Sequence, residues 1–146
     1  MIILGLLASA ADRHSLRYIL DDSNWKLEFA DGIETIQPIL RKNNTGVIVT
    51  DCVLPDGNNW KDLLSEIQAH PLPPSLILAD RNADDRLWAE VLNLGAHDLL
   101  MKPFDANEVL RVIGSAWRSW AYQCEQGQCR RNSIATAMVL SKSAGV

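Results

Sequence analysis

The feature of this sequence that most constrains its fold is a regular alternation of short apolar runs with stretches of helical periodicity. The strongest runs, at 2–7, 46–51 and 75–79, predict strands buried on both faces of a sheet, and weaker strands are expected at 27–30 and 97–101. Between them, apolar side chains recur as on one face of a helix over about 9–20, 33–39, 60–67, 83–94 and 105–116. Five strand–helix pairs in this order predict an α/β fold with a doubly wound parallel sheet and right-handed crossovers.

Local signals indicate where individual helices begin and end. Ser9 followed by Asp12 is typical of a capping box, in which the hydroxyl accepts a first-turn amide and the carboxylate reaches back. We therefore interpret Asp12 as a helix cap. Pro38 has no backbone N–H, so it is expected to kink the second helix or delay its start. Gly95 is expected to end the fourth helix.

Composition narrows the class of protein. With 146 residues, 47% of them hydrophobic and 22% charged, the chain has the size of one folded domain and is unlike a disordered protein. The net charge is −4, but residues 1–117 carry −7 and residues 118–146 carry +3. Phosphate contacts need clustered cations, so a wholly basic nucleic-acid-binding protein is disfavoured.

The sequence also bears on location. No apolar run reaches the ~18–20 residues that span a bilayer, so no membrane association is expected. The apolar start lacks a basic region before it and is interpreted as a strand rather than a signal peptide. Cys52, Cys124 and Cys129 are too few and too scattered for a disulfide framework, and Cys124 and Cys129 lack a second ligand pair for a metal. Together these features predict a cytoplasmic protein.

In a parallel sheet of this kind, functional residues gather in the loops that follow the carboxyl ends of the strands. In this chain those loops hold Leu7–Ser9, Asp51–Asp56, Ala79–Asp80 and Lys102–Pro103. Among them, Asp51 places a carboxylate at the end of the strongest predicted strand.

Two motif pairs carry a family resemblance: Val47–Asp51 followed by Leu54–Gly57, and Leu94–Asp98 leading into Lys102–Asp105. In this order and spacing the chain resembles a response-regulator receiver domain over about residues 1–120. The resemblance implies a flavodoxin-like (βα)5 fold with strand order 2-1-3-4-5 and a histidine kinase or phosphotransfer protein as partner. Residues 121–146 are then a C-terminal tail or the start of a linker.

The resemblance assigns three roles. Asp51 matches the aspartate that accepts the phosphoryl group, a role that implies an exposed carboxylate which an in-line phosphoryl donor can approach. Lys102 matches the lysine that pairs with the acyl phosphate. Pro103 matches the proline that follows a cis peptide bond, which an X-Pro sequence tolerates at about 0.5–1 kcal/mol. Such a domain signals by binding and conformation and is not expected to be an enzyme.

The chain also departs from the family pattern. Leu7 and Ala8 stand where two acidic residues hold Mg²⁺ together with the phosphoacceptor, and Asp12 lies about a turn too far along to replace them. Ala79 stands in place of the Thr or Ser that follows the phosphoryl oxygens, and Leu99 in place of the switch aromatic. Because Mg²⁺ prefers oxygen ligands, we expect it to bind only weakly, at Asp51.

These departures leave several functions open. One is an atypical receiver that is phosphorylated slowly or not at all, and another is a phosphorylation-independent interaction module. A nucleotide-binding enzyme is disfavoured, because Ala8–Ala11 lacks the glycines of a phosphate-binding loop. No helix-turn-helix signature is complete, so direct nucleic-acid binding is not expected. Arg130 and Arg131 begin a linker or belong to a solvated terminal segment.

The five tryptophans suggest where partners could bind. Trp60 shares a helical face with apolar neighbours and is predicted to be core, whereas Trp88 lies beside an apolar stripe and Trp117 and Trp120 lie on the last helix. In receivers the fourth helix, fifth strand and fifth helix form the usual dimerisation and output face. Exposed aromatics there would suit a homodimer, and the alternative is that they pack onto the sheet or under the tail.

Overall fold

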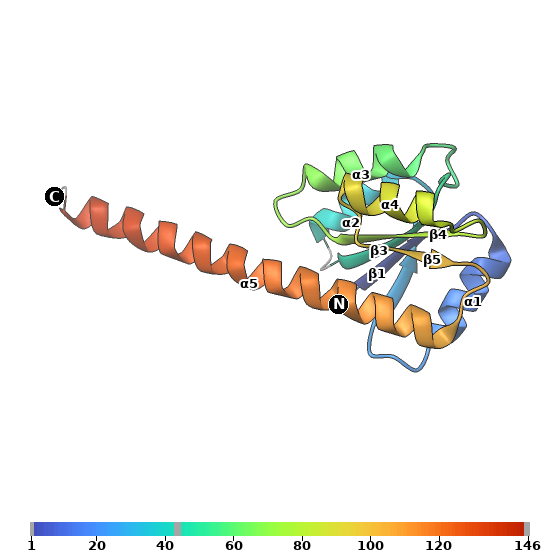
Figure 1. Ribbon diagram of the computed structural model, residues 1–146. Coiled ribbons are helices and arrows are strands. Elements are labelled where there is room, and N and C mark those ends of the chain that lie inside the picture. Colours follow the sequence, from blue (N-terminus) through green and yellow to red (C-terminus); the bar gives the residue numbers. More distant parts are fainter. Residues whose placement is uncertain (1, 43–44, 145–146) are drawn as a thin grey trace.

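The structure is a computed structural model, which describes the backbone of residues 2–42 and 45–144 and the side chains of residues 2–41 and 45–126. Five parallel strands form one sheet in the order β2-β1-β3-β4-β5 (Figure 1). The strands are β1 (Ile2–Leu6), β2 (Lys26–Phe29), β3 (Thr45–Asp51), β4 (Ser75–Asp80) and β5 (Asp98–Met101). The helices are α1 (Ala10–Leu20), α2 (Ile33–Lys42), α3 (Trp60–Gln68), α4 (Asp85–Leu94) and α5 (Ala106–Ala144). The predicted fold class and the strand order are confirmed.

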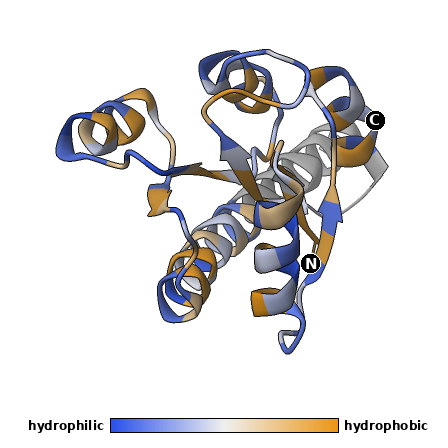
Figure 2. Ribbon diagram, turned by 90° about the vertical axis from the view of Figure 1, so that its right-hand side faces the viewer, coloured by the Kyte–Doolittle hydropathy of each residue, from blue (hydrophilic) through white to orange (hydrophobic). Residues whose placement is uncertain are grey.

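Helices cover both faces of the sheet, as a doubly wound fold requires. On one face, alternate strand residues such as Leu4, Ile48 and Leu78 pack against α2, α3 and α4. On the other face, their neighbours such as Ile3 and Val49 pack against α1 and α5. All seven residues of β3 are buried, which explains its continuous apolar and β-branched sequence. Figure 2 shows the same division, with hydrophobic residues along the strands and on one side of the helices.

The helix ends confirm some local predictions and correct one. Gly95 adopts φ +103° and its N–H donates to carbonyls of the last turn of α4, so it ends that helix as predicted. Pro38 lies inside α2, which nevertheless begins at Ile33, so the prediction of a delayed start is wrong. Burial of Ile36 and Leu40 on the sheet holds α2 together although Pro38 donates no backbone hydrogen bond.

The last helix is longer than the sequence pattern indicated. α5 runs without a break from Ala106 to Ala144, across residue 121, and continues past the sheet (Figure 1). A domain boundary at residue 120 therefore falls inside a helix and stays a prediction. The side chains of Cys129, Arg130 and Arg131, on which the tail predictions rest, lie outside the described residues. None of the helices in the described part of the chain contains an apolar stretch of the length that spans a bilayer.

Candidate functional site

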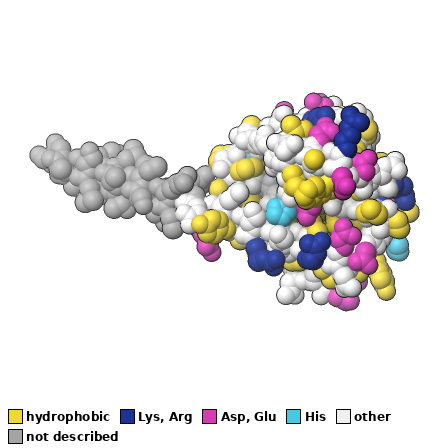
Figure 3. Space-filling model, in the orientation of Figure 1, with side chains coloured by type: hydrophobic (Ala, Val, Ile, Leu, Met, Phe, Trp, Pro, Cys, Tyr) yellow, Lys and Arg dark blue, Asp and Glu magenta, His cyan; other side chains and the backbone are white. Residues whose placement is uncertain are grey.

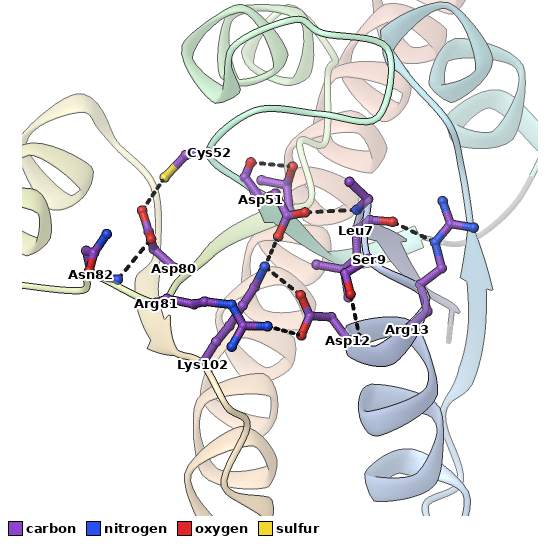
Figure 4. Close-up of polar contacts among 12 residues, drawn as sticks. Leu7, Ser9, Asp12, Arg13, Asp51, Cys52, Asp80, Arg81, Asn82 and Lys102 are labelled. Carbon is purple, nitrogen blue, oxygen red and sulfur yellow. Dashed lines mark hydrogen bonds and ion pairs between the residues drawn. The ribbon is translucent and has the colours of Figure 1, made fainter.

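The carboxyl edge of the sheet brings the two principal predicted residues together. Asp51 is the last residue of β3, and Lys102 directly follows β5. The Lys102 ammonium donates to Asp51 Oδ1, and the backbone N–H of Ala8 donates to Asp51 Oδ2 over 2.8 Å (Figure 4). The Lys102–Pro103 peptide bond is cis. Both carboxylate oxygens of Asp51 therefore accept hydrogen bonds from loops on the same edge of the sheet. Asp51 is only 9% exposed, so the expectation of an exposed carboxylate is wrong.

Asp12 belongs to this site, and its interpretation as a reaching-back cap is wrong. Its backbone N–H does meet the Ser9 hydroxyl, at 3.5 Å. Its carboxylate turns instead to the sheet edge, where Oδ2 lies 2.9 Å from Lys102 Nζ and Oδ1 lies 3.3 Å from Arg81 Nη2 (Figure 4). Asp12 is only 6% exposed. Because α1 begins immediately beyond β1, its first turn stands over the same edge as Asp51, and this placement is the signal that sequence reasoning missed.

Two opposing effects act on the Lys102 ammonium. Burial lowers its pKa, while the hydrogen bonds and charges of Asp51 and Asp12 raise it, and the net result is a raised pKa. Its side chain is 9% exposed, like that of Asp12. Lys102 is thus held as a buried cation shared by two carboxylates.

A second polar pair lies beside the first and was not predicted. Cys52 Sγ donates to Asp80 Oδ2 over 3.0 Å, and the backbone N–H of Asn82 donates to Asp80 Oδ1 over 3.0 Å. Burial, and then the hydrogen bond and charge of Asp80, raise the pKa of the Cys52 thiol to about 12. The Asn82 amide and the Cys52 thiol hold the pKa of Asp80 below its usual value. The thiol at position 52 is therefore a donor rather than a nucleophile at neutral pH.

Three of the four residues that replace family side chains are buried among apolar neighbours, whereas Ala8 is exposed. Leu7 is fully buried in the core on the α1 and α5 side of the sheet, and Ala79 is 1% exposed in the same core. Ala79 is the register partner of Asp51. Leu99, where the family has an aromatic, is 8% exposed and packs in the opposite core.

These surroundings do not fit Mg²⁺. A hard cation needs several oxygen ligands, but Leu7 offers none from its side chain and Ala8 directs an N–H at Asp51. The carboxylates of Asp12 and Asp51 are both bound to the ammonium of Lys102. Among the residues whose side chains are described, no group of three or more His, Cys, Asp or Glu is arranged to hold a metal.

The tryptophans divide between core and surface. Trp60 is 3% exposed, which confirms its predicted core position, and Trp120 is buried and stacks on Trp117 with ring centroids 5.1 Å apart. Trp88 on α4 is 49% exposed, and Met101 at the end of β5 is 51% exposed. Figure 3 shows exposed hydrophobic side chains between α4 and β5 with acidic side chains beside them. The packing alternative therefore holds for α5, and an exposed aromatic remains on α4.

Comparison with known proteins places this site in a family. The family described as response regulator receiver domain matches residues 9–114. The chain is 30% identical to the transcriptional regulatory protein FixJ of Bradyrhizobium diazoefficiens over 109 residues, 75% of this chain and 53% of that protein. It is 32% identical to the DNA-binding transcriptional regulator NtrC of Rhizobium meliloti over 108 residues, 73% of this chain and 22% of that protein.

A solved structure agrees with these sequence relatives. Full-length FixJ from B. japonicum superposes with a TM-score of 0.71 at 27% identity, covering 85% of this chain and 61% of that one. This chain spans about half the length of FixJ and about a fifth of NtrC. The family match begins just before α1 and ends inside α5, so it leaves out β1 but includes Asp12, Asp51, Arg81 and Lys102. The chain therefore belongs to the response regulator receiver domain family of two-component signalling proteins.

Proposed function

We propose that this chain is an atypical receiver, in which Asp51 occupies the phosphoacceptor position but Mg²⁺-dependent phosphoryl transfer to it is slow or absent. Phosphorylation on an aspartate is the general function of the family, and receiver domains are signalling modules rather than catalysts. One observation carries the proposal: the cation at Asp51 is Lys102, shared with Asp12, and the neighbouring positions Leu7 and Ala8 offer no side-chain oxygen.

The physical reason lies in the charge that develops during phosphoryl transfer. Negative charge spreads over the equatorial oxygens of the transferred group, and a bound metal ion ordinarily neutralises it. At Asp51 one ammonium already bonds to two carboxylates, so little positive charge is left for an incoming group. Ala79 removes a further hydroxyl donor from the same edge. Transfer from a histidine kinase or phosphotransfer protein, the partners proposed here, is therefore expected to be slow.

The test is a titration with Mg²⁺ and beryllofluoride followed by amide NMR. The backbone amide of Ala8 is the reporter, because it bonds directly to Asp51 Oδ2. We expect no saturable shift of this amide at millimolar Mg²⁺. Asp51→Asn is the matched control, since it keeps the shape of the side chain and removes its charge. A saturable shift at millimolar or lower Mg²⁺ that Asp51→Asn abolishes would overturn the proposal.

A second candidate function, a phosphorylation-independent interaction module, is favoured by the exposed surface at α4 and β5. A cavity of about 340 Å³ in this surface is lined by Trp88, Leu99 and Met101 and by the acidic residues Asp84, Asp85 and Glu108. The homodimer proposed through the α4–β5–α5 face would bury this surface. It predicts concentration-dependent association by light scattering that Trp88→Ala weakens, and a strict monomer at high concentration would contradict it. For either function we propose a cytoplasmic location.

A further inference from the structure

The carboxylate of Asp12 is bound as an external anion would be, with one cation for each oxygen. Lys102 Nζ lies 2.9 Å from Oδ2, and Arg81 Nη2 lies 3.3 Å from Oδ1 (Figure 4). The two cations come from different loops, Arg81 after β4 and Lys102 after β5. They meet beside Asp51, which Lys102 also contacts. The proposed function assigns no role to Arg81.

We propose that Arg81 and Lys102 form an oxyanion site beside Asp51 that Asp12 fills from within the chain. Displacement of the Asp12 carboxylate then opens the site to a tetrahedral oxyanion without a metal ion, with a phosphoryl-like group on Asp51 as its ligand. Asp12 is in this sense an internal competitor that holds the site closed. This inference rests on the proposed function, because it explains what replaces the metal at Asp51.

The charge balance supports this arrangement. Arg81 and Lys102 supply two positive charges, and Asp12 and Asp51 supply two negative ones, so these four paired side chains are together neutral. The neighbouring carboxylate of Asp80 is bound instead by the Cys52 thiol and the Asn82 amide. A phosphoryl-like group on Asp51 brings additional negative charge, which the two cations match only when Asp12 is no longer paired with them. Lys102 and Asp12 have side chains 9% exposed, so charge in this place is only partly screened by water.

The two cations differ in freedom, which allows the site to accept a larger group. The Arg81 side chain is 61% exposed, whereas Lys102 is buried and held by Asp51 as well as by Asp12. Loss of Asp12 therefore leaves Lys102 in place beside Asp51 and leaves Arg81 free to follow the new anion. A guanidinium binds a tetrahedral oxyanion through two parallel N–H groups, which a carboxylate or a phosphoryl group can both accept.

The experiment compares beryllofluoride binding in metal-free buffer between the wild-type chain and Asp12→Asn. Beryllofluoride forms a Be–O bond with one oxygen of Asp51 while water or fluoride leaves the beryllium, so it reports a phosphoryl-like group at that position. We expect Asp12→Asn to bind about 10- to 100-fold more tightly than wild type, as expected when one nearby negative charge is removed from a partly buried site. Fluorine-19 NMR of the ligand and the chemical shift of the Ala8 amide both measure this affinity.

Three further variants make the result specific. Asp22→Asn removes a carboxylate from an exposed position just after α1 and should leave the affinity unchanged. Arg81→Gln added to Asp12→Asn should remove most of the gained affinity. Asp12→Ser repeats the measurement in case the amide of Asn disturbs folding, which thermal unfolding of each variant checks. A parallel titration with inorganic phosphate, repeated in Asp51→Asn, distinguishes a free anion from a group bound to Asp51.

Each outcome bears on a different statement. If the folded Asp12 variants bind metal-free beryllofluoride no more tightly than wild type, the oxyanion site is refuted and the proposed function stands. If Arg81→Gln leaves the gain intact, Arg81 is not part of the site and the inference is wrong. If instead the wild-type chain binds beryllofluoride readily with millimolar Mg²⁺, the proposed function fails, whatever the Asp12 variants do.

Discussion

Replacement of Lys102 by Met should destabilise the domain through the two carboxylates that it leaves behind. The side chains of Lys102, Asp12 and Asp51 are 9%, 9% and 12% exposed, so all three charges are largely removed from water. Removing one partner of a buried ion pair costs about 3–5 kcal/mol. In the variant, Asp12 still forms its ion pair with Arg81, and Asp51 still accepts the hydrogen bond from the Ala8 amide. We therefore expect a smaller loss, about 2–4 kcal/mol, in the free energy of unfolding.

Urea unfolding at pH 7, followed by circular dichroism, measures this loss. Lys61→Met is the matched control, because Lys61 pairs with Glu90 at 2.5 Å but the two side chains are 51% and 40% exposed. An exposed pair contributes about 0–1 kcal/mol, so the control should change stability little. Adding Asp12→Asn to Lys102→Met should restore part of the loss, because it removes one of the two unpaired carboxylates.

The difference in the free energy of unfolding between wild type and Lys102→Met should depend on pH, because it follows the pKa of Lys102. This pKa is raised in the folded chain above its ordinary value of 10.5. The stability that Lys102 contributes is therefore complete below pH 10.5 and is lost as the pH rises through the higher folded value. The reasoning is refuted if Lys102→Met unfolds within about 0.5 kcal/mol of wild type at pH 7, a change typical of uninvolved surface sites.

Four further predictions test the fold and the second polar pair. Trp60→Ala should lower the free energy of unfolding by about 3–5 kcal/mol, because the ring of Trp60 is buried, and urea unfolding measures this loss. Trp88→Ala should lower it far less, because Trp88 is half-exposed. Gly95→Ala should cost about 1 kcal/mol or more, because φ is +103° and its Cβ would lie 2.9 Å from a glutamine side chain; thermal unfolding measures it. Alkylation of Cys52 at pH 8, resolved by peptide mass spectrometry, should be about 1,000-fold slower than that of an ordinary thiol, because its pKa is about 12. Asp80→Asn should reduce stability fully above about pH 3.8 and progressively less as the pH falls from there through the lowered folded pKa of Asp80, as urea unfolding at several pH values measures.

The strands and most of the helix ends could be predicted from the sequence because they depend on residues that are close to one another along the chain. The burial of β3 on both faces follows from an apolar, β-branched run, and the left-handed Gly95 follows from the end of an apolar stripe. The helix expected from residue 33 is present, but the delay expected from Pro38 does not occur, because burial of the apolar face of α2 outweighs the hydrogen bond that Pro38 cannot donate. The length of α5 was missed because the sequence loses its regular periodicity after residue 121.

The candidate site was only half visible in the sequence. The positions of Asp51 and Lys102 follow from strand ends, since parallel strands carry their carboxyl ends to one edge. The contacts of Asp12 with Lys102 and of Cys52 with Asp80 join residues 90 and 28 positions apart. No local pattern encodes the direction in which those side chains point. A first-turn carboxylate serves equally well as a cap or as a partner for a distant cation.

The sequence by itself determined the order of strands and helices, the edge of the sheet where the polar loops gather, and the replacement of acidic ligands by Leu7 and Ala8. Only the tertiary structure decided that Asp12 faces Lys102 and Arg81 and that one ammonium serves two carboxylates. The physical reason is the distance along the chain over which each kind of interaction acts. Periodicity and capping act over about four residues. A buried charge, in contrast, finds its partner wherever packing brings an opposite charge close and excludes water.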